Sequence, residues 1–238
     1  MLGRFLEFSV HCADVAQSLE FYGRLGFTQT PVGDAWKHAY AVITDGRLCI
    51  GLHGEAPTLA ALTFVRPDIL EQATLLESRG LSLEFRRLGS GVFNEIGLLD
   101  PGGTLLRMIE ARSFSPSERQ SMQTSSCGYF QEVALPEPEP QAAKDFWEDL
   151  GFVGMDEPQA LLPHISCTSD SVDVGLYDRR QLHEPMLVFE ADDLHARMAR
   201  LASAGIDPQT PPPSLRGRPA ALYRAPEGTA VLMLGPTD

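Results

Sequence analysis

The sequence predicts an α+β protein of two tandem domains, each built from two β-α-β-β-β units. The motif FYGRLGF at residues 21–27 returns as FWEDLGF at residues 146–152, an offset of 125. An acidic residue followed twelve positions later by glycine occurs four times, first as Asp14 and Gly26. A short apolar or alternating run precedes each of these four segments. Repetition at a fixed offset is typical of a repeated structural unit, so four copies of one unit are expected.

Each unit is expected to begin with a strand and to end with further short strands. Apolar or alternating residues indicate the first strands, at residues 5–10, 62–65, 130–135 and 186–189. The later runs of the same kind are residues 40–44, 48–52, 91–98, 104–109, 173–177, 220–223 and 230–234.

An amphipathic helix is expected between each acidic residue and its glycine. In the segment 193–205, Leu194, Met198 and Leu201 recur at helical spacing. The acidic residue suits the positive end of a helix, and glycine suits the position just after its last turn. The other three helices are expected within residues 14–26, 68–80 and 139–151.

The repeat divides the 238 residues into a first domain at 1–114, a linker at 115–126 and a second domain at 127–238. The linker is rich in serine and glutamine and lacks apolar periodicity, although a surface helix is an alternative. Residues 208–218 contain four prolines and are expected to form a loop, either a lid or a simple connection.

Charge and composition restrict the class of partner. The chain has 19 basic and 32 acidic residues, a net charge of −13, and no cluster of lysine and arginine. This pattern argues against nucleic acid and anionic membranes and favours cationic small molecules. No apolar run is long enough to span a membrane, the N-terminus does not resemble a secretory signal, and the four cysteines lack a C-x-x-C spacing. We expect a cytoplasmic protein with reduced thiols, as a monomer or homodimer.

The motif at residues 21–27 and the DPGG turn at residues 100–103, with weaker copies at 146–152 and 225–228, resemble the vicinal oxygen chelate superfamily. This family contains glyoxalase I, bleomycin-resistance proteins and extradiol dioxygenases. The resemblance covers nearly the whole chain apart from the linker. It implies two tandem glyoxalase-like domains, in each of which two units close into a cupped sheet that holds a divalent metal. Because one such fold hosts lyases, dioxygenases, epimerases and binding proteins, the function must be argued from the site.

The ligand positions that the resemblance implies do not favour a metal here. A metal needs about three protein ligands, and each half offers one carboxylate. An arginine at one of the positions would repel a cation. We therefore predict neither a metal nor another cofactor. In the first and second half, the four positions hold Glu7 and Glu132, Ala61 and Met186, Arg107 and Leu232, and Gly51 and Gly175.

Side-chain alternation along the strands suggests what else lines the cups. Glu7 and Arg107 are predicted to form a salt bridge in place of the metal, either as a structural pair or with Arg107 holding an anionic group of a ligand. His11 and His53 are either hydrogen-bonded wall residues or acid–base groups, and His53 pairs with Glu7 if their strands adjoin. The predicted ligand-binding residues are Glu7, His11, His53, Arg107, Glu132 and Tyr177. Other side chains expected on these faces are Phe5, Phe130, Asp173 and Glu190.

Three functions stay open. The first is a metal-independent binding protein of the glyoxalase and bleomycin-resistance type that sequesters a cationic or aromatic compound, for example an antibiotic. The second is a lyase, isomerase or dioxygenase-like enzyme with a relocated site, in which Glu7, His11 or His53 acts as acid or base and Arg107 binds an anion. The third is a chain with one degenerate half that serves regulation or assembly.

Overall fold

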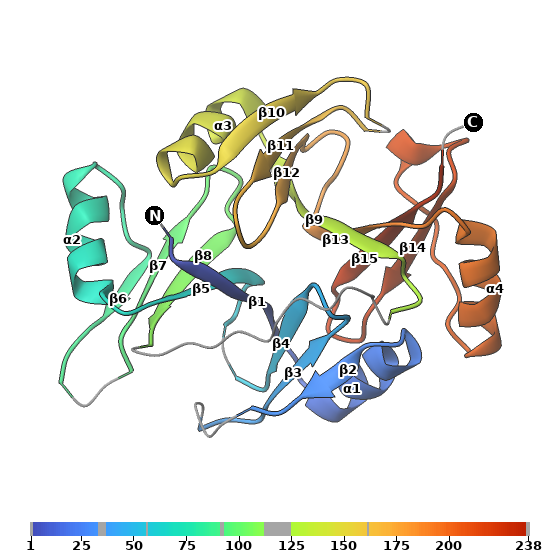
Figure 1. Ribbon diagram of the computed structural model, residues 1–238, viewed down its shortest axis with the longest axis horizontal. Coiled ribbons are helices and arrows are strands. Elements are labelled where there is room, and N and C mark those ends of the chain that lie inside the picture. Colours follow the sequence, from blue (N-terminus) through green and yellow to red (C-terminus); the bar gives the residue numbers. More distant parts are fainter. Residues whose placement is uncertain are drawn as a thin grey trace.

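The computed structural model describes residues 2–32, 37–55, 57–90, 93–111, 125–160 and 162–236. It contains two mixed β-sheets, one in each half of the chain, with helices packed against them (Figure 1). Most of the predicted linker, residues 115–126, lies outside the described residues, and so do Gly91 and Val92 of the predicted strand at 91–98. Among the described residues, no helix is long and apolar enough to cross a membrane. All four cysteines are described, and none is in a disulfide.

The first sheet has eight strands in the order β2-β3-β4-β1-β5-β8-β7-β6. Strands β1 and β5 pair antiparallel at its centre, and each begins one of the two repeated units. The elements of this half are β1 (Arg4–His11), α1 (Val15–Arg24), β2 (Thr28–Thr30), β3 (Tyr40–Thr44), β4 (Cys49–His53), β5 (Ala61–Arg66), α2 (Ile69–Ser78), β6 (Phe85–Arg87), β7 (Glu95–Leu99) and β8 (Leu105–Glu110).

The second sheet has seven strands in the order β10-β11-β12-β9-β13-β15-β14, and β9 and β13 form its antiparallel centre. The two sheets confirm the predicted α+β class and the doubled unit in each half. The elements of this half are β9 (Tyr129–Glu137), α3 (Pro140–Asp149), β10 (Val153–Glu157), β11 (His164–Thr168), β12 (Val174–Asp178), β13 (Met186–Glu190), α4 (Leu194–Ser203), β14 (Ala220–Arg224) and β15 (Ala230–Leu234).

The fourth unit differs from the other three because one strand is reduced to a single bridge, between Gln209 and Leu222. The proline-rich residues 208–218 form the predicted loop there, with one short 3-10 turn at Pro213–Leu215. Proline lacks the backbone N–H that a strand needs on its paired side, so this run cannot form a full edge strand.

The helix ends confirm the repeated glycine, whereas of the four acids at the described helix starts only Asp14 forms a side-chain cap. Asp14 caps α1 by accepting hydrogen bonds from the backbone N–H groups of Ala16 and Gln17. The glycine after each of the four helices has a positive φ, between 75° and 98° for Gly26, Gly80, Gly151 and Gly205. A side chain is disfavoured in this conformation, which is why the glycines recur.

A bulge in the first strand of each half corrects one prediction. The pairing register shifts between Phe5 and Glu7 in β1, and between Phe130 and Glu132 in β9. An extra residue in one strand moves the residues before it to the opposite face. Simple alternation predicted that Phe5 and Phe130 share a face with the two glutamates. Because of the bulges, they lie on the opposite face. They pack with the main core, where Phe5 contacts Phe64.

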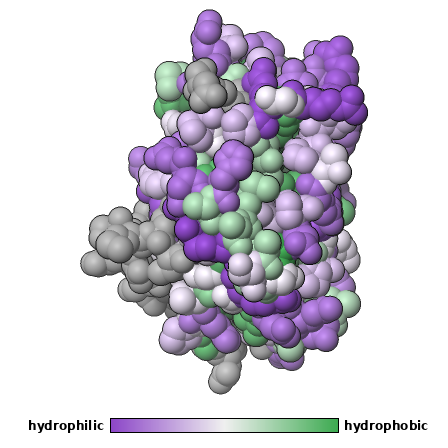
Figure 2. All heavy atoms as spheres, turned by 90° about the vertical axis from the view of Figure 1, so that its right-hand side faces the viewer, coloured by the Kyte–Doolittle hydropathy of each residue, from purple (hydrophilic) through white to green (hydrophobic). Residues whose placement is uncertain are grey.

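The apolar interior has two parts. The main core runs through both halves and includes a contact between Phe27 and Phe189, whose ring centroids lie 6.3 Å apart. A second, smaller cluster lies on the other face of the second sheet and includes Leu162, Leu182, Val188 and Leu232. On the outside, the face that carries α4 is mostly hydrophilic, with a narrow central band of apolar side chains (Figure 2).

One contact joins the halves through Glu227, in the turn between β14 and β15. Its carboxylate accepts hydrogen bonds from Ser18 and Tyr22 of α1, each at 2.7 Å. The offset of 125 relates these three residues to Gly102, Ala143 and Trp147. The corresponding second contact therefore has a glycine where the first has an acid.

Next to Gly102, the first half meets another acid of the second half, Glu137. Glu137, in the place that Cys12 holds in the first half, is fully buried beside Gly102, and lies next to Asp100. Burial, followed by the negative charge of Asp100, raises the pKa of Glu137 to about 9. The pKa of Asp100 is also raised by burial. The two carboxyl groups thus share a proton at neutral pH.

Candidate functional site

The centre of the first sheet carries a buried carboxylate with three hydrogen-bond donors. Glu7, on β1, is 1% exposed. It accepts hydrogen bonds from Ser9 Oγ at 2.7 Å, His53 Nε2 at 2.8 Å and Tyr40 Oη at 2.6 Å. Burying a charged group is costly unless it is paired and hydrogen-bonded, and these donors meet that requirement.

The sheet brings Glu7 and His53 together through a missing side chain. Strand β1 pairs parallel with β4, and Gly51 is the register partner of Ser9, two residues after Glu7. A Cβ atom on Gly51 would lie 2.1 Å from Glu7 Oε1. Glycine therefore lets the carboxylate lie across β4 and reach His53, which confirms that these two residues pair.

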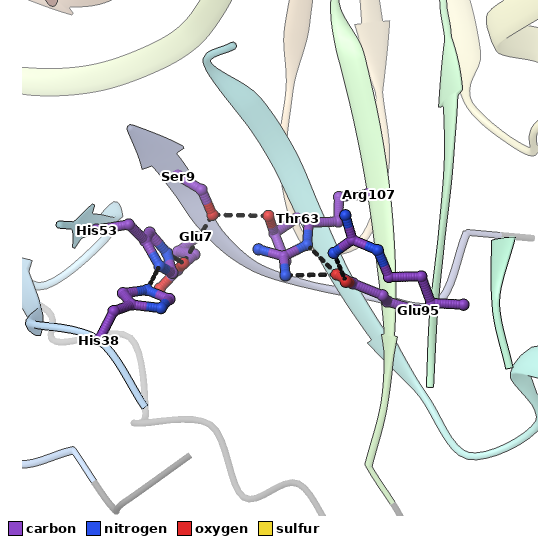
Figure 3. A network of polar contacts seen from close by, with 8 residues as sticks. Glu7, Ser9, His38, His53, Thr63, Glu95 and Arg107 are labelled. Atoms are coloured by element: carbon purple, nitrogen blue, oxygen red, sulfur yellow. Dashed lines mark hydrogen bonds and ion pairs between the residues drawn. The ribbon is translucent and has the colours of Figure 1, made fainter. Parts of the chain in front are cut away.

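The network continues outward to a second histidine (Figure 3). A carboxylate can only accept, so Nε2 of His53 donates to Glu7. Nδ1 of a neutral His53 then accepts from His38 Nε2, at 3.0 Å. Partial burial, followed by the charge of His53, lowers the pKa of His38. Glu7, His53 and His38 thus form a chain along which a proton could move between the buried carboxylate and a half-buried imidazole.

The predicted salt bridge between Glu7 and Arg107 is wrong. Strand β5 lies between β1 and β8, and Thr63 on β5 is the register partner of both residues. The side chain of Arg107 turns away from β1, toward β7, which is the other neighbour of β8 and carries Glu95. Arg107 Nε instead donates to Glu95 Oε2 at 2.8 Å (Figure 3). Arg87 Nη1 also donates to Glu95, to Oε1 at 2.5 Å.

The residues at the family's metal positions do not fit a metal. In the first half, Glu7 is engaged by three donors, Ala61 has no ligand atom, and Arg107 is a cation. In the second half, Met186 and Leu232 are buried apolar side chains beside Glu132. Over the described part of the chain, no group of three or more histidine, cysteine, aspartate or glutamate side chains is arranged to hold a metal ion.

The second sheet carries a related trio, with histidine and tyrosine exchanged. Glu132 Oε1 accepts a hydrogen bond from Tyr177 Oη at 2.6 Å, and His164 Nε2 lies 3.6 Å from Glu132 Oε2. The rings of His164 and Tyr177 are stacked, with centroids 4.5 Å apart and an interplanar angle of 11°. A Cβ atom on Gly175 would lie 2.2 Å from Glu132 Oε1, so this glycine has the same role as Gly51.

The histidine and the tyrosine of each trio lie on paired strands, and their positions are interchanged between the two halves. In the first half Tyr40 on β3 is the register partner of His53 on β4. In the second half His164 on β11 is the partner of Tyr177 on β12. Both halves therefore present one carboxylate, one imidazole and one phenol, built from opposite strands.

The surroundings of the second trio are much more apolar. Ala134, Val188 and Leu232 stand where the first half has Ser9, Thr63 and Arg107. Glu132 thus lacks the serine that donates to Glu7. One of its oxygens, Oε1, receives the hydrogen bond from Tyr177, and its other oxygen faces His164 beyond hydrogen-bonding distance.

A cavity of about 490 Å³ opens over this trio. We call it the second cup. Its wall includes Glu132, His164 and Tyr177, and its apolar part comes from the smaller hydrophobic cluster. The described residues that line it include no lysine or arginine. Its carboxylates are Glu132, Glu157, Glu190 and Asp192.

The predicted site residues therefore have different outcomes. Glu7 and His53 meet, and Glu132 and Tyr177 meet in the second cup. His11 is exposed at the end of β1 and lies outside both networks. Glu190 lines the second cup as expected. Asp173 does not, because it lines a small cavity beside Phe5 and Phe130, on the opposite side of the sheet.

Sequence reasoning missed His38, Tyr40, Glu95 and His164. For Tyr40 and His164, the internal repeat contained a usable signal. Aligning Gly51 with Gly175, an offset of 124, also aligns Tyr40 with His164 and His53 with Tyr177. No comparable pattern pointed to Glu95, which the hairpin of β7 and β8 brings to Arg107.

Comparisons with known proteins agree on the fold. No family model and no curated protein matches the sequence. Among solved structures, a catechol 2,3-dioxygenase matches with a TM-score of 0.62 and 14% identity over 98% of this chain and 88% of the other. A variant of homoprotocatechuate 2,3-dioxygenase from Brevibacterium fuscum matches with a TM-score of 0.62 and 17% identity, covering 99% and 72%. A Mn(II)-bound glyoxalase from Novosphingobium aromaticivorans matches with a TM-score of 0.60 and 15% identity, covering 98% and 81%.

These likenesses extend over nearly the whole chain, at an identity that supports an inference about fold and not about reaction. Together with the two sheets and the doubled units, they show that the chain has the fold of the vicinal oxygen chelate superfamily, as two tandem glyoxalase-like domains.

Proposed function

We propose that this protein binds a small cationic or aromatic molecule in the second cup, without the help of a metal ion. The observation that carries the proposal is the cavity of about 490 Å³, which combines an apolar floor with four carboxylates. Its volume is within the range of small-molecule sites, and such sites are typically apolar with a few polar groups. Binding of this kind suits a role in sequestering a compound, for example a cationic antibiotic.

The electrostatics support a cationic ligand. Glu157, Glu190 and Asp192 line the cavity nearer to solvent, and Glu132 lies buried behind them. Carboxylates around a concave surface raise the local concentration of cations and their rate of association. The stacked rings of His164 and Tyr177 add an aromatic wall.

The test is a thermal-shift screen, followed by calorimetry, with cationic aromatic antibiotics, thiol adducts and catechols. A ligand that binds the folded state raises its apparent stability. Treatment with EDTA should leave binding unchanged. Ser166→Tyr, which fills the cup from β11, should abolish it, whereas Val153→Tyr, on an exposed part of β10 outside the cup, should not. A stoichiometric divalent ion that is required for binding would contradict the proposal.

The chain of Glu7, His53 and His38 favours a second candidate, acid–base catalysis in the first half. A carboxylate that orients one imidazole, which in turn contacts another, is an arrangement suited to moving protons. Turnover of thiol-adduct or catechol substrates by the wild type would support a lyase, isomerase or dioxygenase-like enzyme. That turnover should be lost in His53→Gln and kept in Ser166→Tyr, and the opposite result would exclude the first half as its site.

A further inference from the structure

We propose that the second cup binds a primary or secondary ammonium ion between Glu132 Oε2 and His164 Nε2, and that this ion replaces the proton of His164. The inference rests on the proposed function and specifies its ligand. The ligand class is an amine with at least two N–H groups and an apolar body that fits the floor of the cup.

Glu132 can accept more hydrogen bonds than it receives within the described residues. Tyr177 donates to Oε1, and within the described residues no hydrogen bond reaches Oε2. Glu132 is 6% exposed and lines the second cup, so a ligand in the cup can reach this oxygen. The corresponding Glu7 is saturated by three donors. A buried carboxylate oxygen without a donor favours a ligand that supplies one.

A second feature of the site is the orientation of His164. Its Nδ1 lies 2.9 Å from the carbonyl oxygen of Leu162, which can only accept, so Nδ1 carries a proton. In the neutral ring the lone pair is then on Nε2, which faces Glu132 Oε2 at 3.6 Å. Two acceptors at this separation can both receive hydrogen bonds of about 2.9 Å from a single nitrogen.

A third feature of the site is the charge that it holds in the absence of a ligand. Glu132 and Tyr177 contact the His164 ring directly, and Glu157 on β10 adds a negative charge nearby. Burial by itself lowers the pKa of His164, but attraction to the nearby Glu132 carboxylate outweighs burial and raises this pKa above its usual value. The proton on Nε2 thus balances Glu132 until another cation takes its place.

The exchange conserves charge. An ammonium ion enters, donates one N–H to Glu132 Oε2 and a second to His164 Nε2, and the former proton of Nε2 leaves to solvent. The buried pair is one cation and one carboxylate before and after, so no net charge is added to the interior. The apolar body of the ligand lies against Leu162, Val188 and Leu232.

Three probes of the same shape test the assignment: 3-phenylpropylamine, 3-phenylpropan-1-ol and trimethyl(3-phenylpropyl)ammonium. The amine should bind the wild type roughly tenfold to hundredfold more tightly than the alcohol, the range expected for a hydrogen bond to a charged group. The quaternary ion, which has no N–H, should also bind more weakly than the amine. Calorimetry in buffers of different ionisation enthalpy should show up to one proton released at pH 6, and less as the pH rises.

Two variants and a control complete the test. Glu132→Gln should weaken the amine by a similar factor, and His164→Gln should bind it without proton release. Glu20→Gln removes an exposed carboxylate on α1 and should leave the affinity unchanged. Circular dichroism and thermal unfolding check that each variant is folded.

Equal affinity for the amine and the alcohol, or unchanged amine affinity in Glu132→Gln, would overturn the ammonium site and leave binding in the cup intact. Proton release that persists in His164→Gln would overturn the exchange. If no compound of the wider screen binds, and Ser166→Tyr changes nothing, both this inference and the proposed function fail.

Discussion

Gly51 and Gly175 determine where the two buried carboxylates lie. Each glycine occupies a position at which a Cβ atom would lie within 2.2 Å of a glutamate oxygen. The absence of a side chain there matters more than backbone freedom, because neither residue has a positive φ. In each half, the position of the glutamate therefore depends on the glycine, and its contact with the neighbouring histidine and tyrosine depends on both.

Gly51→Ala should destabilise the protein. The added methyl group displaces the Glu7 carboxylate from His53 and leaves a buried charge poorly paired, which typically costs about 3 kcal/mol. Chemical denaturation measures the change in unfolding free energy. Gly23→Ala is the matched control, because Gly23 lies within α1 and its Cβ would contact nothing, so it should be neutral or stabilising by up to about 1 kcal/mol. Equal stability of the two variants would contradict this account of Gly51.

Single residues also mark what the sequence can and cannot predict. The pairing of Glu7 with His53 was foreseeable, because it follows from adjacent strands and a shared face. The partner of Arg107 could not be predicted in this way. It depends on which strands are neighbours in the sheet, and the sequence does not reveal that order. Glu95 lies on β7, which pairs directly with the strand of Arg107, whereas β5 separates Glu7 from that strand.

At the scale of helices and strands, the sequence predicted those features of the repeated unit that depend on neighbouring residues along the chain. The Asp14 cap, the terminal glycines and the four helices follow from helix physics alone. The bulges in β1 and β9 were not predictable from alternation, since one inserted residue leaves the apolar pattern almost unchanged. The strands β2, β6, β10 and β11 were not predicted. β2 and β6 have three residues each and carry little periodicity, and β10 and β11 each contain several polar or small residues.

The strands β9 and β13 differ from β1 and β5 at two positions that control the second cup. We expect the double variant Ala134→Ser and Val188→Thr to recreate the donors that surround Glu7. Saturating Glu132 in this way should weaken binding of 3-phenylpropylamine about tenfold, as measured by calorimetry. Val153→Thr makes the same kind of change on the exposed part of β10 and serves as the control. Unchanged affinity in the double variant would contradict the role given to Glu132 Oε2.

For the whole molecule, the buried pair of Glu137 and Asp100 predicts how stability depends on pH. The pKa of Glu137 is raised to about 9 from an ordinary value of 4.5, so between these values the folded state holds a proton that the unfolded state releases. Stability therefore falls as the pH rises from about 4.5 to 9 and then becomes constant, with a total effect of a few kcal/mol.

Glu137→Gln should remove most of this dependence and should be more stable than the wild type at pH 8. Urea denaturation at pH 5, 7 and 9 measures it. Glu139→Gln changes an exposed acid two residues away and should keep the wild-type slope. A wild-type stability that rises with pH over this range would show that Glu137 is ionised in the folded state.

The contacts of Glu227 and of Glu137 each join unlike residues of the two halves. Glu227 and Glu137 both belong to the second half, and the first half supplies hydroxyl donors at one joint and the proton-sharing Asp100 at the other. Two first halves placed together would leave Tyr22 facing a glycine, and two second halves would bring unpartnered acids against Trp147. Neither half therefore offers a copy of itself the contacts that it makes with the other half.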